Sequence, residues 1–132
     1  MIPLAIASAL DGPELKIFGA DYQTPDGTAV RDYLHVEDIA KAHILALEHL
    51  LSSGKSSFIN LGTGKGHSVK EIIKCLQELG IPVRASNAPR REGDPAFLVA
   101  NPLKANEVLK WQPEYTNIKD ILKTAVVWHT KA

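Results

Sequence analysis

The chain has 132 residues, a length that suits one domain. Its 15 basic and 15 acidic residues balance, so a broad positive surface for nucleic acid or anionic lipid is not expected, and the local positive charge of Arg84, Arg90 and Arg91 suits a small anion instead. The single cysteine excludes an internal disulfide and a cysteine-based zinc site, which agrees with a reducing compartment.

The start of the chain imitates an export signal. Residues 2–10 are apolar and contain Ala7, Ser8 and Ala9, which resemble a small-residue cleavage site. A signal peptide also needs a basic segment in front and a longer apolar core, and neither is present. No apolar run approaches the roughly 18 residues that span a bilayer. We therefore expect a cytoplasmic protein that binds no membrane.

The first half of the chain alternates short elements. Residues 2–10 predict a helix that an Asp-Gly-Pro breaker closes, and residues 15–18 predict a strand. A polar loop is expected over residues 19–32, followed by an extended segment at 33–36. A helix then runs to about residue 51, because its apolar positions repeat at helical spacing.

The second half repeats this alternation. A strand is predicted at residues 57–61, and a capping box formed by Ser68 and Glu71 opens a helix that runs to residue 79. The remaining elements are expected in this order: a strand at 82–85, a loop at 87–94, an extended segment at 96–100, a helix from Pro102 behind an Asn101 cap, and a helix at 117–131. Together they predict a single α/β domain over residues 1–132.

A glycine-rich segment, Gly62-x-Gly64-x-Gly66, follows the predicted strand and invites comparison with nucleotide-binding loops. A dinucleotide fingerprint needs glycine or alanine at position 67, where His67 stands, and a P-loop needs serine or threonine at position 66. We therefore interpret the segment as a structural turn.

Two arginines carry the strongest binding signal. Arg31 and Arg91 each lie in a stretch that contains turn-forming residues, so both guanidinium groups are expected on irregular segments beside regular elements. A planar fork of donors suits phosphate oxygens, and two such forks suit a diphosphate. The simpler alternatives are a salt bridge of Arg31 to Asp32 or Asp38, and a solvated charged loop around Arg91.

Two strings of residues are specific: Asp26-Gly27-Thr28-x-x-Arg31-Asp32-Tyr33-x-His35-Val36 and Arg90-Arg91-Glu92-Gly93-Asp94. Together they closely resemble the C-terminal half of the UDP-glucose 4-epimerases, which are extended short-chain dehydrogenases. The resemblance runs from about residue 2 to the end of the chain. It implies the small substrate-binding portion of that fold, without the N-terminal Rossmann half.

The resemblance implies a role for six residues. Arg31 and Arg91 would contact the diphosphate of a UDP-sugar, and Asp94 would accept hydrogen bonds from the ribose hydroxyls. The segment that lines the uracil pocket in the family, through backbone groups and an aromatic edge, matches three residues here: Lys16, Ile17 and Phe18. The simpler interpretation of that segment is an edge strand with a buried phenylalanine.

The resemblance also implies that the half that binds NAD and performs the epimerisation lies outside this chain. The chain alone is then expected to bind a UDP-sugar without NAD and without catalysis, so its status as an enzyme stays open. The helix ending near residue 51 and the strand at 57–61 would pack on that other half, which implies a homodimer or a separate N-terminal half as partner. Two alternatives remain: a non-catalytic nucleotide-sugar-binding or interaction module, and a remnant that binds no nucleotide.

Other motifs are interpreted as structural. Tyr115 and Lys119 have the spacing of the catalytic Tyr-x-x-x-Lys of short-chain dehydrogenases, but the helix is expected to start only at residue 117, so the pair would not share a helix face. The five histidines show no metal-binding spacing. We expect His43 in the core and His35 in a structural hydrogen bond.

Overall fold

The computed structural model describes residues 1–53 and 55–131, and it confirms the α/β class. Within these ranges the helices are α1 (Ile2–Ala9), α2 (Val36–Ser53), α3 (Val69–Glu78), α4 (Leu103–Leu109) and α5 (Ile118–Thr130). The strands are β1 (Leu15–Phe18), β2 (Val30–Asp32), β3 (Gly66–Ser68), β4 (Ala85–Ala88) and β5 (Phe97–Leu98).

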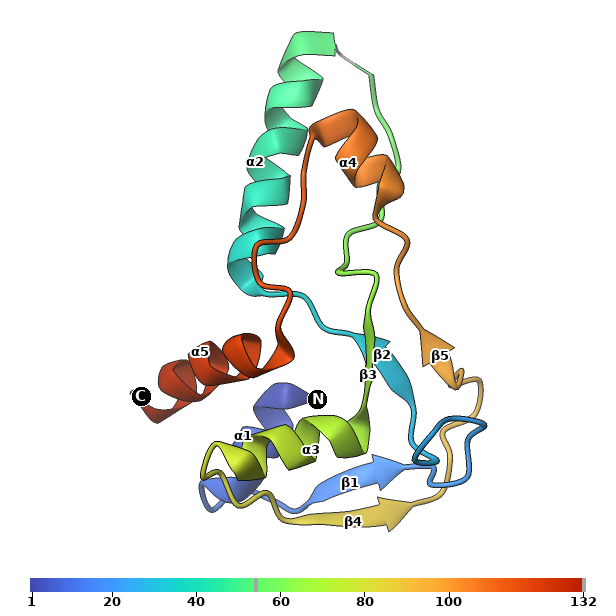
Figure 1. Ribbon diagram of the computed structural model, residues 1–132, viewed down its shortest axis with the longest axis vertical. Coiled ribbons are helices and arrows are strands. Elements are labelled where there is room, and N and C mark those ends of the chain that lie inside the picture. The colour runs from blue at the N-terminus through green and yellow to red at the C-terminus, as the bar shows by residue number, and fades with distance from the viewer. Residues whose placement is uncertain (54, 132) are drawn as a thin grey trace.

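The molecule consists of a broad part and a narrower arm (Figure 1). Helices α1, α3 and α5 lie with β1 and β4 in the broad part, whereas α2 and α4 pack together in the arm. The broad part contains the main core, whose fully buried aliphatic side chains are Ile6, Ile72, Leu76 and Leu122. No helix in the described ranges has both the length and the apolar character needed to cross a membrane.

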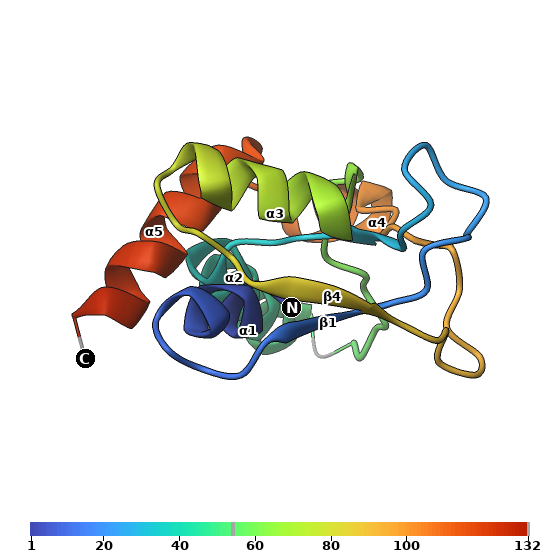
Figure 2. The same cartoon turned by 90° about the horizontal axis from the view of Figure 1, so that it is seen from below.

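Two small sheets position the loops. Strands β1 and β4 pair in parallel, with Phe18 opposite Ala88, and they lie side by side beneath α3 in Figure 2. Strand β2 is central in the second sheet, antiparallel to β3 and parallel to β5. In that register Arg31 stands opposite His67 on one side and Leu98 on the other. Arg31 therefore lies within a sheet, and the prediction that it lies on an irregular segment was wrong.

Helix α1 ends at the predicted Asp-Gly-Pro turn, where an arginine from a later segment binds its last carbonyls. The N–H of Gly12 donates to the Ala7 carbonyl at 2.8 Å, and a Cβ at Gly12 would lie only 2.5 Å from that oxygen, so glycine is required. The Arg84 guanidinium donates to the carbonyls of Ser8 at 2.8 Å and Gly12 at 2.7 Å. These bonds hold Arg84 at the start of β4, whereas Arg91 lies beyond its end. The expectation that Arg84 contributes to one anion site with Arg91 was therefore wrong.

Helix α3 confirms the predicted capping box. Ser68 Oγ accepts from the N–H of Glu71 at 3.0 Å, and the Glu71 side chain accepts from the N–H of Ser68 at 3.4 Å. The helix ends at Glu78, and Gly80 follows it with a φ of 80°, a left-handed conformation that favours glycine.

Asparagine side chains bind the first N–H groups of α4 and α5. The predicted cap Asn101 lies one position before the N-cap of α4, which is Pro102, whereas Asn117 is the N-cap of α5. Asn101 Oδ1 accepts from the N–H of Leu103 at 3.1 Å, and Asn117 Oδ1 accepts from the N–H of Lys119 at 2.9 Å. Helix α4 starts one residue later than expected, because Pro102 occupies the position before its first turn.

Three strand predictions were wrong in position, because a strand requires a neighbouring strand to pair with as well as a suitable sequence. Residues 57–61 form no strand, and Phe58 is 98% exposed; the strand is instead β3, which pairs with β2. Strand β2 itself lies at the end of the predicted loop 19–32. The strand predicted at 82–85 is displaced to β4, the segment in register with β1.

The two histidine predictions had different outcomes. His35 is buried and structural: its Nδ1 accepts from the N–H of Glu37 at 3.1 Å, and its Nε2 hydrogen-bonds Thr124 Oγ1 at 2.9 Å. His43 is exposed, with its Nδ1 2.8 Å from the Ile39 carbonyl oxygen, so its assignment to the core was wrong. The apolar face of α2 on which it lies is largely uncovered by the described residues.

A buried carboxylate joins the start of α2 to the segment before α5. Asp38 is fully buried, and its two oxygens accept from the N–H groups of Glu114 and Tyr115, each at 3.0 Å. The Asp38 carbonyl accepts from Nε1 of Trp111 at 2.9 Å. Burial of a charge is tolerated where hydrogen bonds replace water, and here two backbone donors do so.

The loop before β2 is held by Asp26. Its Oδ1 accepts from the N–H of Thr28 at 2.9 Å and from the Thr28 hydroxyl at 2.6 Å, while its Oδ2 accepts from the Ser68 hydroxyl. Burial alone would raise the pKa of Asp26, but these hydrogen bonds outweigh it and hold that pKa below its ordinary value. The ionised carboxylate therefore stabilises the fold above its ordinary pKa, and this stabilisation is lost as the pH falls through the lowered value.

Replacing Asp38 by asparagine should lower the free energy of unfolding by about 1.5–3 kcal/mol, because the amide nitrogen would face one of the two backbone donors. Urea denaturation at pH 7, followed by tryptophan fluorescence, measures the change. Glu48→Gln makes the same chemical change at an exposed position of α2 and should stay within about 0.5 kcal/mol of wild type. Equal effects of the two substitutions would contradict the role assigned to Asp38.

Asp26→Asn should lower the free energy of unfolding by about 1 kcal/mol at pH 7, once solvent screening of this partly exposed group is allowed for. The difference from wild type should shrink as the pH falls below 3.8, the ordinary pKa, because Asp26 then takes up a proton in the unfolded chain and, at its lowered pKa, in the folded chain. Urea denaturation at neutral and acidic pH measures both values. A difference that widens on acidification would show that the ionised carboxylate is not the stabilising form.

Candidate functional site

Arg31 on β2 meets Asp94 in the loop after β4. One guanidinium nitrogen of Arg31 donates to the Asp94 carboxylate, and the other donates to the Val30 carbonyl at 2.6 Å. The side chains of Arg31 and Asp94 are 22% and 31% exposed, so a ligand can reach both. Neither Asp32 nor Asp38, the two alternatives raised by the sequence, is the ion-pair partner of Arg31.

Arg91 lies over an aromatic ring at the end of β1. Its guanidinium carbon is 3.8 Å from the centre of the Phe18 ring, a cation–π geometry. The N–H of Asp94 donates to the Arg91 carbonyl at 3.3 Å, so one turn carries both residues. Through that turn the structure brings Arg31, Asp94, Arg91 and Phe18 into one neighbourhood. Unlike Arg31, Arg91 does lie on an irregular segment, as predicted.

Arg90 takes different partners from Arg91. Its Nε donates to Asp21 at 2.7 Å, and its guanidinium carbon lies 4.3 Å from the centre of the Tyr22 ring. The hydrogen bond from Arg90 holds the pKa of the Asp21 carboxyl below its ordinary value. Sequence reasoning named neither Asp21 nor Tyr22, since nothing in the local pattern marks residues 69 and 68 positions away as partners of Arg90.

The three residues of β1 that were predicted to bind a ligand differ in what they can offer it. Lys16 is exposed, and its Nζ lies 2.6 Å from the Glu14 carboxylate and 2.8 Å from Ser86 Oγ. The Ile17 side chain is part of the core. Strand β1 pairs with β4 along one edge, and no described strand pairs with its other edge. Backbone groups and the Phe18 ring are therefore what this segment presents, and its role in binding stays a prediction.

The glycine-rich segment is occupied by a carboxylate of the protein itself. Asp32 accepts from the N–H of Thr63 at 3.0 Å, from the Thr63 hydroxyl at 2.6 Å, and from the N–H of Gly64 at 3.0 Å. A Cβ at Gly62 would lie 2.5 Å from the same carboxylate, so this close approach requires glycine. The segment is a structural turn, as interpreted, and its donors are already used.

The Tyr-x-x-x-Lys match is a coincidence, as predicted. Tyr115 lies outside α5, stacks on His35 at 3.7 Å between ring centres, and donates its hydroxyl to Glu37 at 3.0 Å. The hydrogen bond to Glu37 raises the pKa of Tyr115. Lys119 pairs with Glu78 at 2.7 Å, so the two side chains serve different contacts.

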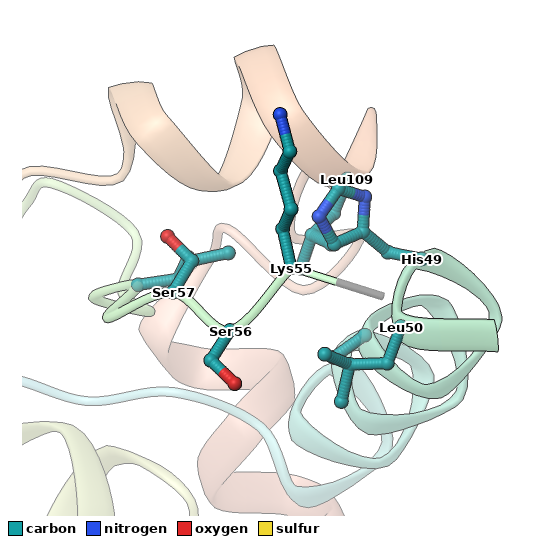
Figure 3. A pocket seen from close by; sticks show the side chains of 8 residues that line it. His49, Leu50, Lys55, Ser56, Ser57 and Leu109 are labelled. Carbon is teal, nitrogen blue, oxygen red and sulfur yellow. The ribbon is translucent and has the colours of Figure 1, made fainter. Parts of the chain in front are cut away.

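Two cavities are lined by other residues. The smaller, of about 220 Å³, lies between the end of α2, the end of α4 and the segment that follows α2; Figure 3 labels His49, Leu50, Lys55, Ser56, Ser57 and Leu109 on its wall. The larger, of about 760 Å³, lies among α1, α5 and the first turn of α2. Neither cavity is lined by Arg31 or Arg91, so the binding of one diphosphate by both arginines stays a prediction. In the described ranges no three His, Cys, Asp or Glu side chains gather to hold a metal ion.

Comparisons with known proteins point in one direction. The NAD dependent epimerase/dehydratase family matches residues 1–62. The UDP-glucose 4-epimerase of Halalkalibacterium halodurans is 50% identical over 131 residues, which cover 98% of this chain and 39% of that protein. A solved UDP-glucose 4-epimerase superposes with a TM-score of 0.91 at 50% identity, over 98% of this chain and 40% of that one.

A second solved relative carries ligands. The UDP-glucose 4-epimerase from Stenotrophomonas maltophila, with bound NAD and formylated UDP-arabinopyranose, superposes with a TM-score of 0.91 at 39% identity, over 98% of this chain and 39% of that one. This chain thus spans about two fifths of the length of the relatives that it matches. It is a homologue of the C-terminal portion of the UDP-glucose 4-epimerases, and its α/β fold is that portion of an extended short-chain dehydrogenase.

Proposed function

We propose that residues 1–132 form a UDP-sugar-binding unit of a UDP-glucose 4-epimerase, in which Arg31 and Arg91 hold the diphosphate and Asp94 holds the ribose. The observation that carries the proposal is the contact between Arg31 and Asp94, which are 63 residues apart in sequence and meet beside Arg91. The backbone of β1 and the Phe18 ring would take the uracil.

The chemistry of the four side chains supports this assignment. A guanidinium donates to two oxygens at once, and two guanidinium groups offset the charge of a diphosphate. A carboxylate is an acceptor that a vicinal diol can satisfy with both hydroxyls. An aromatic ring beside the free edge of a strand offers a flat apolar surface next to unpaired backbone donors and acceptors, which suits a pyrimidine.

The relative with bound NAD and a UDP-sugar supports the same reading by homology. We assign no cofactor-binding and no catalytic residue to this chain, and we place NAD binding and hydride transfer in the portion of the relatives that it does not cover. On this proposal the chain contributes to epimerisation, within galactose and nucleotide-sugar metabolism in the cytoplasm, only together with such a portion.

An apolar stripe on α2 supports a requirement for a partner. Val36, Ile44, Leu47 and Leu51 lie on one face of the helix and are between 58% and 80% exposed. Covering such side chains is worth about 1.5–3 kcal/mol each. We propose that a separate N-terminal half, or a second copy of this chain, covers the stripe.

The alternative functions share the fold but not the binding chemistry. A remnant or a pure interaction subunit would bind no UDP, whereas a non-catalytic nucleotide-sugar module would bind UDP without ever completing an enzyme. Titration with UDP separates the remnant from the other two. Addition of NAD and an N-terminal half then separates the epimerase from the non-catalytic module.

Arg91→Ala should weaken UDP binding by about 1.5–3 kcal/mol, or roughly 10- to 150-fold, because charge-assisted hydrogen bonds to the diphosphate are lost. Isothermal titration calorimetry on the wild type and the variant measures this. Arg90→Ala is the matched control: it removes the neighbouring guanidinium, which is held by Asp21, and should change the affinity by no more than about twofold. An effect of Arg90→Ala as large as that of Arg91→Ala would move the site away from Arg91.

The double substitution Leu47→Lys with Leu51→Lys should convert a self-associating chain into a monomer, because two charges would then have to be desolvated in the contact. Light scattering at several protein concentrations measures the mass. Leu4→Lys, at an exposed apolar position of α1, is the control and should leave association unchanged. A monomeric wild-type chain that binds no apolar dye would contradict the requirement for a partner.

A further inference from the structure

The guanidinium of Arg31 has an acidic partner in the structure. Its terminal nitrogen donates to the Asp94 carboxylate, and both side chains are largely shielded from water. Shielding from solvent strengthens the attraction between the two charges relative to an exposed pair. An anion that approaches Arg31 therefore competes with this carboxylate.

We propose that Asp94 makes the site selective for nucleoside diphosphates over inorganic phosphate and pyrophosphate. In this role the Asp94 carboxylate competes with an incoming anion for the Arg31 guanidinium. Arg31 becomes available to a ligand whose ribose hydroxyls donate hydrogen bonds to Asp94 in place of those from Arg31. The inference rests on the proposed function and adds to it a reason why the site would reject free anions.

A free inorganic anion is disfavoured at Arg31 for two reasons. It must displace the Asp94 carboxylate from the guanidinium, and it then lies beside a carboxylate that has lost its partner, so like charges face one another. Arg90 offers limited compensation because it is paired with Asp21. Arg91 is open to a free anion and to a nucleotide alike, so the discrimination comes from Asp94.

A nucleoside diphosphate brings its own replacement donors. Its ribose carries two hydroxyls that can donate to the Asp94 carboxylate while its phosphates accept from Arg31. The turn that links Asp94 to Arg91 places this exchange next to the second guanidinium. The ligand thus exchanges one set of partners for another, instead of leaving a charged group unpaired.

The test compares Asp94→Asn with the wild type by calorimetric titration of pyrophosphate and of UDP, at fixed ionic strength and without divalent cations. Asp94→Asn should tighten pyrophosphate binding roughly five- to tenfold and should tighten UDP binding not at all, so that the preference for UDP over pyrophosphate falls by at least that factor. The matched control is Asp21→Asn, which removes the same charge from a neighbouring carboxylate–arginine pair and should change either affinity by no more than about twofold.

The inference is overturned if Asp94→Asn affects pyrophosphate no more than Asp21→Asn does, or if it tightens UDP by the same factor as pyrophosphate. In the second case Asp94 acts only as a general negative charge. If the wild type binds UDP, either failure leaves the proposed function intact. If the wild type binds neither ligand, the proposed function fails and the inference fails with it.

Discussion

The contact between Arg31 and Asp94 is the interaction on which the candidate site depends. It joins the central strand of one sheet to the turn that follows the second sheet, across 63 residues of sequence. The same turn carries Arg91, which lies over the last side chain of β1. This contact and the contact of Arg91 with Phe18 together place the second guanidinium relative to the first.

Three aspartates have backbone partners, whereas Asp94, like Asp21, pairs with an arginine side chain. Asp26, Asp32 and Asp38 each accept hydrogen bonds from backbone N–H groups, and these bonds hold a loop, a glycine-rich turn and the start of α2. Because these donors are backbone groups fixed by the fold, a ligand cannot easily replace them as partners of the three carboxylates. Asp94 is bound to the partly exposed side chain of Arg31, and ligand hydroxyls can replace Arg31 as donors to the Asp94 carboxylate.

The sequence predicted best what depends on neighbouring residues. The capping box of α3 and the turn that closes α1 are local, and both were found in place. Strands were predicted less well, because β2, β3 and β4 are defined by partners that the local pattern does not contain. His43 was assigned to the core from helical spacing alone, yet no described segment covers that part of α2.

The same distinction applies to the site. Arg31, Arg91 and Asp94 could be named from specific strings. The contact of Arg91 with the Phe18 ring and the pairing of Arg90 with Asp21 required the folded chain. The partner of Arg31 was sought within seven residues and was found in the other string. The attraction between two charges depends on their distance in space and not on their separation in sequence. The turn that brings Asp94 close to Arg31 lies 63 residues further along the chain.

The central claim is that Arg31 and Arg91 bind one diphosphate. Side-chain ¹⁵N NMR of the arginines during a titration with UDP tests it most directly, because each guanidinium reports separately. The account predicts that the Nε–H signals of Arg31 and Arg91 move together with a single dissociation constant, while that of Arg84, held by two backbone carbonyls, stays in place. Movement of only one of the two signals, or different dissociation constants for them, would contradict it.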